Sequence, residues 1–272
     1  MFGKLDREYD DAKHLGMLVP LRHLAGALGW KTFSTTIKGV GKVTLRPGST
    51  DIYVLRQVFH KQEYNFSWQK QYARLPKAIA RAVANGQTPV IVDCGANIGA
   101  SSLYFARRYP QATVLAVEPD PGNAALCRIN TLGLSNIVTH EAAIGSSPGC
   151  VELVSDTTFG AEWAFQTRRA AEGSVAVVTI NDLLASIPNA VPVLVKMDIE
   201  GFEEDLFSAN TEWLDRTTVV IVEPHDWLFD DRATSRTLQS AMGKRNFDLL
   251  ISAENLVYVN RDEPAIGAPA GT

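Results

Sequence analysis

Four carboxylates stand where predicted β-strands of this chain end, and they are the residues best suited to bind a charged ligand. They are Asp93, Glu118, Glu141 and Asp198. Because the carboxyl ends of parallel strands meet at one edge of an α/β sheet, we expect these acids to share one site. An acidic rim repels a pyrophosphate and attracts a cation. The sulfonium and ammonium groups of S-adenosylmethionine fit that requirement.

A glycine turn follows the first of these strands. Val90 to Val92 form a β-branched run, and the turn after them has acid, glycine and asparagine in alternate positions up to Gly99. A helix is expected to start there, which makes a strand, turn and helix unit typical of nucleotide-binding folds. The spacing differs from the G-x-G-x-x-G fingerprint of dinucleotide sites. The cofactor-binding candidates in this unit are Asp93, Gly95, Ala96, Asn97, Gly99 and Ser102.

Side chains that could remove a proton are grouped at the ends of two later strands. An unactivated alcohol that accepts a methyl group must lose its proton, which asks for a general base. The candidates are Lys196, Asp198 and Glu200 after one strand, and Glu223 and His225 after the next. His225 has the unperturbed pKa that suits a base near neutral pH, although a hydrogen-bonded loop histidine is an equal alternative. Asp198 is expected to lie in the site. Glu200 could be a catalytic residue, or it could cap the next helix.

The same acids with His225 could hold a divalent ion such as Mg²⁺. Lys196 argues against it because it already supplies a cation, and no tight ligand spacing requires a metal. We therefore assign no metal ligands and treat Mg²⁺ as an open alternative. Trp163 and Trp227 could form an apolar wall for a sugar, or pack as core or rim residues.

Composition limits the class of protein. The chain has 272 residues, 46% hydrophobic and 21% charged, with a net charge of −4. This is ordinary globular composition, and no basic run of the kind that binds nucleic acid occurs. The three cysteines lie far apart, so neither a zinc site nor a disulfide framework is expected. No window is apolar enough to span a bilayer, and we expect a cytoplasmic protein that acts on a small-molecule or glycan acceptor.

The predicted elements give three parts. Residues 1–75 are expected to form an N-terminal extension of a tail, a β-hairpin and a helix, residues 76–262 the cofactor-binding domain, and residues 263–272 a flexible tail. From residue 90 strands and helices alternate, with an inserted strand pair at 151–155 and 175–179 and a closing hairpin near 247–259. This predicts a doubly wound α/β sheet, mainly parallel, with a reversed C-terminal edge strand.

Several motifs, in order and at matching spacing, resemble one family. The sequence is similar to FkbM-type S-adenosylmethionine-dependent methyltransferases over roughly residues 45–260. The motifs that carry the resemblance are VDCGANIGASSL (92–103), VEP (117–119), AAIG (142–145), TINDLL (179–184), KMDIEGFE (196–203) and VEPH (222–225). The resemblance implies a class I methyltransferase fold, which is Rossmann-like, and O-methylation of a hydroxyl on a sugar or a polyketide-like natural product.

The resemblance also assigns roles to residues. It implies that the glycine turn wraps the methionine part of the cofactor, that Glu118, next to Pro119, binds the ribose, and that Glu141 and Ala142 hold the adenine. Cys94 departs from the family, where an apolar β-branched residue is more usual. Two other functions remain open: an NAD-dependent oxidoreductase, and a catalytically silent binding module with this fold. The acceptor, the regiochemistry and the oligomeric state stay undetermined.

Overall fold

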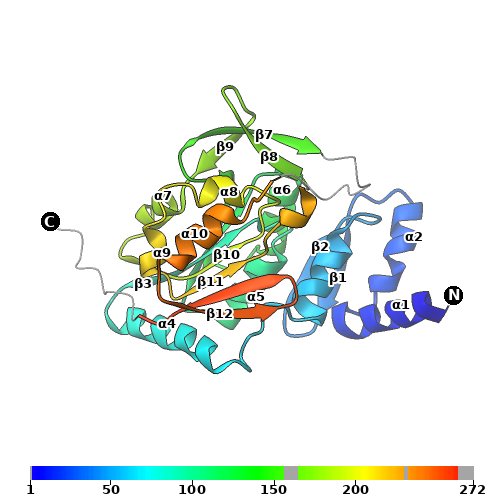
Figure 1. Ribbon diagram of the computed structural model, residues 1–272. Helices are drawn as coiled ribbons and strands as arrows, with labels where there is room; N and C mark the ends of the chain where they lie inside the picture. Colours follow the sequence, from blue (N-terminus) through cyan, green and yellow to red (C-terminus); the bar gives the residue numbers. More distant parts are fainter. Residues whose placement is uncertain (1, 156–164, 230–231, 263–272) are drawn as a thin grey trace.

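The structure is a computed structural model that describes residues 2–155, 165–229 and 232–262 (Figure 1). Trp163 and the tail expected at 263–272 lie outside the described residues. The centre is a seven-stranded sheet. In spatial order its strands are β12 (Phe247–Ser252), β13 (Asn255–Asn260), β11 (Val219–Val222), β10 (Ala190–Met197), β3 (Thr88–Cys94), β4 (Thr113–Glu118) and β5 (Ile137–Glu141).

The direction of the strands confirms the predicted fold class. Strands β5, β4, β3, β10 and β11 run parallel, whereas β13 is antiparallel to both of its neighbours. One detail differs from the prediction, because the reversed strand is second from the edge and β12 is the edge strand. The tight turn after Ser252 makes β12 and β13 antiparallel. Strand β12 occupies the edge of the sheet, two positions from β11, and β13 then fills the position between β12 and β11.

Helices cover both faces of the sheet. One face carries α4 (Arg74–Ala84), α5 (Ala100–Arg108) and α6 (Pro121–Asn130), and the other carries α7 (Ile180–Ala185), α8 (Glu203–Leu206), α9 (Trp213–Arg216) and α10 (Arg236–Gly243). Side chains of β3 alternate between the faces, as a strand requires. Ile91 packs in the first layer, whereas Val90 and Val92 pack in the second. Full burial of each stabilises the fold by about 2 kcal/mol.

The N-terminal region packs on the first helical layer. It comprises α1 (Phe2–Leu15), η1 (Val19–Leu21), α2 (Arg22–Ala27), β1 (Phe33–Ile37), β2 (Gly41–Leu45), α3 (Asp51–Leu55), η2 (Arg56–His60) and η3 (Lys70–Ala73). The predicted hairpin is present as β1 and β2. The predicted tail is wrong, because residues 2–15 form a helix. Asp11 of that helix is buried in an ion pair with Arg56 (2.6 Å), and Leu15 is fully buried. Apart from such buried positions the segment is mostly polar, and its sequence therefore resembles that of a tail.

A second, four-stranded sheet lies beside the carboxyl ends of the first. Its strands are β6 (Ala143–Ile144), β9 (Val175–Val178), β7 (Gly149–Ser155) and β8 (Phe165–Ala170). The predicted pair is confirmed as β7 and β9, which run antiparallel. Its core of Val151, Val175 and Val177 includes Phe202, which follows β10. Among the helices that the structure describes, none combines the length and the apolar character needed to cross a membrane.

Candidate active site

The glycine turn joins the ends of β3 and β10. Gly95 has φ +77°, and a Cβ at this position would overlap the carbonyl oxygen of Asp198. The N–H of Asp198 donates to the carbonyl of Cys94 (3.1 Å), and the N–H groups of Gly95 and Ala96 both donate to Val117 O (2.9 and 3.0 Å). The backbones of three neighbouring strands therefore meet here, and only glycine allows so close an approach.

Buried ionic contacts hold the turn from beneath. Asp93 is fully buried, and its Oδ2 accepts hydrogen bonds from the hydroxyls of Ser101 and Ser102 (2.6 Å each). Lys196 Nζ lies 3.4 Å from Asp93 Oδ1 and donates to Gly95 O (2.8 Å). Burial lowers the pKa of Lys196, but the negative charges of Asp93 and Asp198 outweigh burial, so the pKa lies well above its ordinary value. Lys196 is therefore protonated and stabilises the turn, so it cannot act as a proton acceptor.

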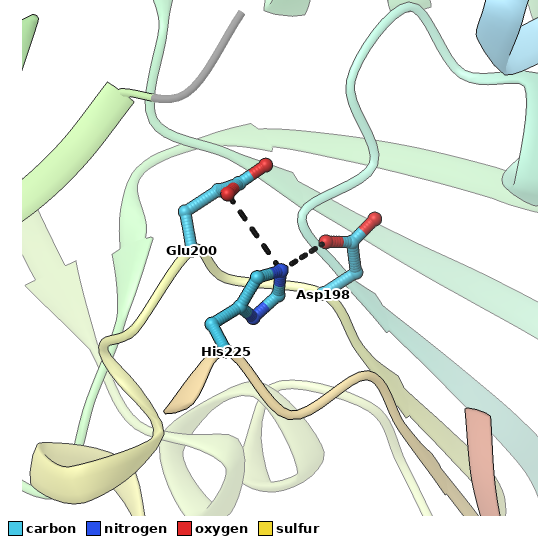
Figure 2. A group of neighbouring side chains, drawn as sticks. All are labelled: Asp198, Glu200 and His225. Carbon is cyan, nitrogen blue, oxygen red and sulfur yellow. Dashed lines mark ion pairs between the residues drawn. The ribbon is translucent and has the colours of Figure 1, made fainter. Parts of the chain in front are cut away.

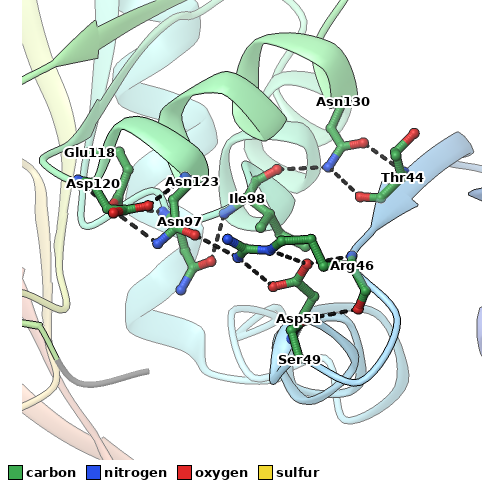
Figure 3. Close-up of polar contacts among 10 residues, drawn as sticks. All are labelled: Thr44, Arg46, Ser49, Asp51, Asn97, Ile98, Glu118, Asp120, Asn123 and Asn130. Atoms are coloured by element: carbon green, nitrogen blue, oxygen red, sulfur yellow. Dashed lines mark hydrogen bonds and ion pairs between the residues drawn. The ribbon is translucent and has the colours of Figure 1, made fainter. Parts of the chain in front are cut away.

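Glu118 is the acid at the end of β4, and it is almost completely buried. Its carboxylate accepts hydrogen bonds from Asn97 N–H (2.8 Å), Asp120 N–H (3.0 Å) and Asn123 Nδ2 (3.3 Å) (Figure 3). Burial raises the pKa of Glu118 to about 7 in spite of these bonds. The residue therefore gains and loses its charge close to physiological pH.

The N-terminal hairpin braces this corner, as Figure 3 shows. Arg46 donates to the side-chain oxygen of Asn123 (2.6 Å) and is itself paired with Asp51 (2.7 Å). Asn130 of α6 joins the carbonyl of Thr44 (3.0 Å) to the carbonyl of Ile98 in the glycine turn (2.8 Å). The region upstream of the sheet thus fixes both the turn and the amide that touches Glu118.

A hollow opens between the turn and the second sheet. Among the predicted site residues, those that line it are Gly95, Asn97, Glu118, Pro119, Ala142, Asp198 and Glu200. Lining residues that the sequence analysis missed are Val117, Asn123, Ala143, Ile144, Thr167, Ile199 and Phe202. Asn123 lies in the first turn of the helix that follows the VEP motif. That position in the sequence could have identified it as a site residue.

The other predicted site residues stand outside this lining: Asp93, Ala96, Gly99, Ser102, Glu141, Lys196 and His225. Gly99 serves helix packing, since a Cβ there would lie 2.8 Å from Cys127 Sγ. Glu141 is exposed and pairs with Arg128 on the surface (2.9 Å). Its predicted contact with an adenine stays a prediction.

His225 lies at the centre of a group of acids just behind the lining. Its Nδ1 is 2.7 Å from Glu203 Oε1. Its Nε2 is 3.6 Å from both Asp198 Oδ1 and Glu200 Oε2 (Figure 2). Glu223 Oε1 is 4.0 Å from the same nitrogen. We call Asp198, Glu200, Glu223 and His225 the carboxylate–histidine cluster.

The acids change the ionisation of this histidine. Burial lowers the pKa of His225, but the bond to Glu203 and the charge of Asp198 outweigh it and raise the pKa to about 10. The unperturbed value used in the sequence analysis therefore does not apply. With only these neighbours the ring is protonated at neutral pH and has no lone pair for a proton. Glu203, which is fully buried, was missed although it ends the KMDIEGFE motif.

The fold and the site together define the class of protein. A parallel sheet with one reversed strand, and a glycine turn that meets acids at the strand ends, form a class I methyltransferase fold. The chain belongs to the FkbM methyltransferase family: residues 93–248 match the family described as methyltransferase FkbM domain. The resemblance read from the sequence is confirmed.

Two curated relatives and a solved structure are similar to the chain. Methyltransferase 1 of Beauveria bassiana is 30% identical over 177 residues, which cover 56% of this chain and 71% of that protein. The 2-O-methyltransferase NoeI of Sinorhizobium fredii is 28% identical over 156 residues, 51% of this chain and 64% of NoeI. Cofactor-bound Rv0187 from MTB aligns over 80% of this chain and all of that chain, with 14% identity and a TM-score of 0.39.

Proposed function

We propose that this methyltransferase uses S-adenosylmethionine and methylates a hydroxyl oxygen of a sugar or natural-product acceptor. The observation that carries the proposal is the pocket in which the glycine turn, buried Glu118 and the carboxylate of Asp198 face one hollow. The name of the relative NoeI, a 2-O-methyltransferase, supports oxygen as the acceptor atom.

The lining fits a nucleoside with a cationic end. A carboxylate offers about four lone-pair sites, and Glu118 uses three of them within the protein. One site remains for a ribose hydroxyl, and the long bond from Asn123 (3.3 Å) is the one that a second hydroxyl would replace. The adenine of the cofactor needs an apolar wall, which is supplied by Ala142, Ile144 and Phe202. Asp198 supplies negative charge near the turn.

The chain's own groups then have defined tasks. S-adenosylmethionine supplies a methyl group activated by its sulfonium. Asp198 and Glu200 border the hollow and hold the acceptor hydroxyl in line by accepting its hydrogen bond. As the oxygen–carbon bond forms and the carbon–sulfur bond breaks, the hydroxyl proton leaves to a carboxylate of the carboxylate–histidine cluster. The positive charge of Lys196 is shared among Asp93, Asp198 (3.7 Å) and the turn.

The test is transfer of labelled methyl to a panel of glycosides and polyketide-like alcohols. We expect label in an ether, located by mass spectrometry, and a calorimetric signal with S-adenosylhomocysteine but none with NAD. Binding of NAD alone would support the oxidoreductase alternative. Binding of S-adenosylhomocysteine without transfer to any acceptor, or transfer to nitrogen only, would contradict the proposal.

Cofactor affinity should depend on pH through Glu118. Its raised pKa of about 7 means that the carboxylate is mostly protonated at pH 6 and mostly ionised at pH 8. Because only the ionised form accepts all its hydrogen bonds, we expect S-adenosylhomocysteine to bind about tenfold more tightly at pH 8 than at pH 6. Calorimetry across this range measures the slope. The Glu118→Gln variant should show a flat profile, and an unchanged slope in that variant would assign the titration to another group.

A further inference from the structure

Three side chains beside the pocket bring their ligating atoms to ion-pair distance without a hydrogen bond between them. Nε2 of His225 and one carboxylate oxygen each of Asp198 and Glu200 all lie within 4.8 Å of one another. His225 is 2% exposed, and its Nε2 hydrogen-bonds to none of the residues that the structure describes. Oε2 of Glu200 is likewise buried without a hydrogen-bond partner in the described part of the chain.

The two separations from Nε2 suit a shared cation better than a direct hydrogen bond. An N–H to oxygen hydrogen bond spans about 2.7–3.2 Å. Ligand atoms that each lie about 2.0–2.2 Å from one ion, at the angles of tetrahedral or octahedral sites, are about 2.8–3.6 Å apart. Nε2 is 3.6 Å from both carboxylate oxygens, which is beyond the first range and at the limit of the second.

The ring of His225 is fixed in the orientation that a metal ligand needs. Its other nitrogen, Nδ1, is bonded to the buried Glu203 (2.7 Å), so Nε2 points toward Asp198 and Glu200 (Figure 2). Carboxylate–histidine pairs of this kind orient metal ligands and make them more basic. Glu200 has φ +53°, a strained conformation for a residue with a side chain. Such strain persists where the surrounding structure imposes it, commonly at functional sites.

We propose that Asp198, Glu200 and His225 bind a divalent transition-metal ion of the Mn²⁺ class, which displaces the proton of Nε2 to solvent. The imidazole suits ions such as Fe²⁺ or Zn²⁺ and the carboxylates suit Mn²⁺, whereas Mg²⁺ and Ca²⁺ are usually held by oxygen ligands alone. Two carboxylates neutralise the charge of the ion, and Glu203 holds the ring. Glu223, at 4.0 Å from Nε2, stays outside the tight group.

The role of the ion rests on the proposed function, but its binding does not. A hydroxyl that coordinates a divalent ion loses its proton more easily, because the cation stabilises the alkoxide. In that arrangement the hydroxyl proton would pass to the carboxylate of Glu223 while the oxygen–carbon bond forms and the carbon–sulfur bond of the cofactor breaks. The positive charge of Lys196 is shared between Asp93 (3.4 Å) and Asp198 (3.7 Å), and the ion would add a second positive charge on the side of the acceptor.

The experiment measures metal binding directly. The full chain is treated with EDTA, freed of chelator and titrated with Mn²⁺, and electron paramagnetic resonance reports the free ion. We expect one Mn²⁺ per chain and at least about tenfold weaker binding in Glu200→Gln, which keeps the shape of the side chain. Glu204→Gln is the matched control, since Glu204 is exposed and pairs with Arg232. It should bind Mn²⁺ like the native protein.

Thermal unfolding shows whether Glu200→Gln is folded, and Asp198→Asn gives a second test of the same ligand set. No binding of Mn²⁺ by the native protein, or equal binding by the Glu200→Gln and Glu204→Gln variants, would overturn the site. If methyl transfer survives chelation while Mn²⁺ still binds, the catalytic role of the ion fails. If Mn²⁺ binds and no alcohol is methylated, the proposed function fails and the metal site stands.

Discussion

Replacing Glu118 with alanine is expected to weaken the binding of S-adenosylhomocysteine by about 100-fold, or about 3 kcal/mol. The change removes the acceptor offered to the ribose. It also leaves the N–H groups of Asn97 and Asp120 without the carboxylate that accepts them now. Each buried donor left unpaired costs about 1–3 kcal/mol, and the loop that forms the pocket floor depends on both. Isothermal titration calorimetry at pH 8 measures the effect.

Glu141→Ala is the matched control. Glu141 pairs in register with Glu118 across β4 and β5, so it ends the neighbouring strand at the same level. Its side chain is exposed and its partner is a surface arginine. We expect a change in affinity of no more than about twofold, as for other surface ion pairs, and a larger loss would support the adenine contact that the family resemblance implies for Glu141. Equal losses in the two variants would mean that the acidic strand ends act through general charge, and Glu118 would lose its specific role.

Gly95→Ala is expected to lower the free energy of unfolding by about 4 kcal/mol and to abolish cofactor binding. Its φ of +77° costs a residue with a Cβ about 1–2 kcal/mol. The larger effect is steric, because the new methyl would overlap the carbonyl oxygen of Asp198 and lie 2.9 Å from its carbonyl carbon. The ends of β3 and β10 would have to separate there. Urea unfolding, followed by circular dichroism, measures the loss.

Gly86→Ala separates the two causes. Gly86 has a similar φ of +68°, but a Cβ there would meet nothing within 4 Å. We expect it to cost only the conformational term, about 1–2 kcal/mol, and to leave cofactor binding unchanged. If Gly95→Ala is no more harmful than Gly86→Ala, the close approach of the two strand ends does not matter for stability.

Local patterns in the sequence determined much of the fold. The β-branched runs, the turn glycines and the alternation of strand and helix predicted the parallel core, the β1–β2 hairpin and the β7–β9 pair, because each depends on neighbouring residues. The helix at residues 2–15 was missed since it is held by tertiary contacts of Asp11 and Leu15. The place of β13 inside the sheet depends on strand order, which no local pattern encodes.

The site shows the same division. The sequence by itself determined that acids follow the strands and that the glycine turn belongs to a methyltransferase of the FkbM family. Only the tertiary structure decided that Glu118 faces the pocket whereas Glu141 faces solvent, and that Asp93 is committed to serines and a lysine. It also decided the charge of His225, because a pKa depends on groups brought together from distant positions. Residue types set which chemistry is available, and burial and distance select which residues perform it.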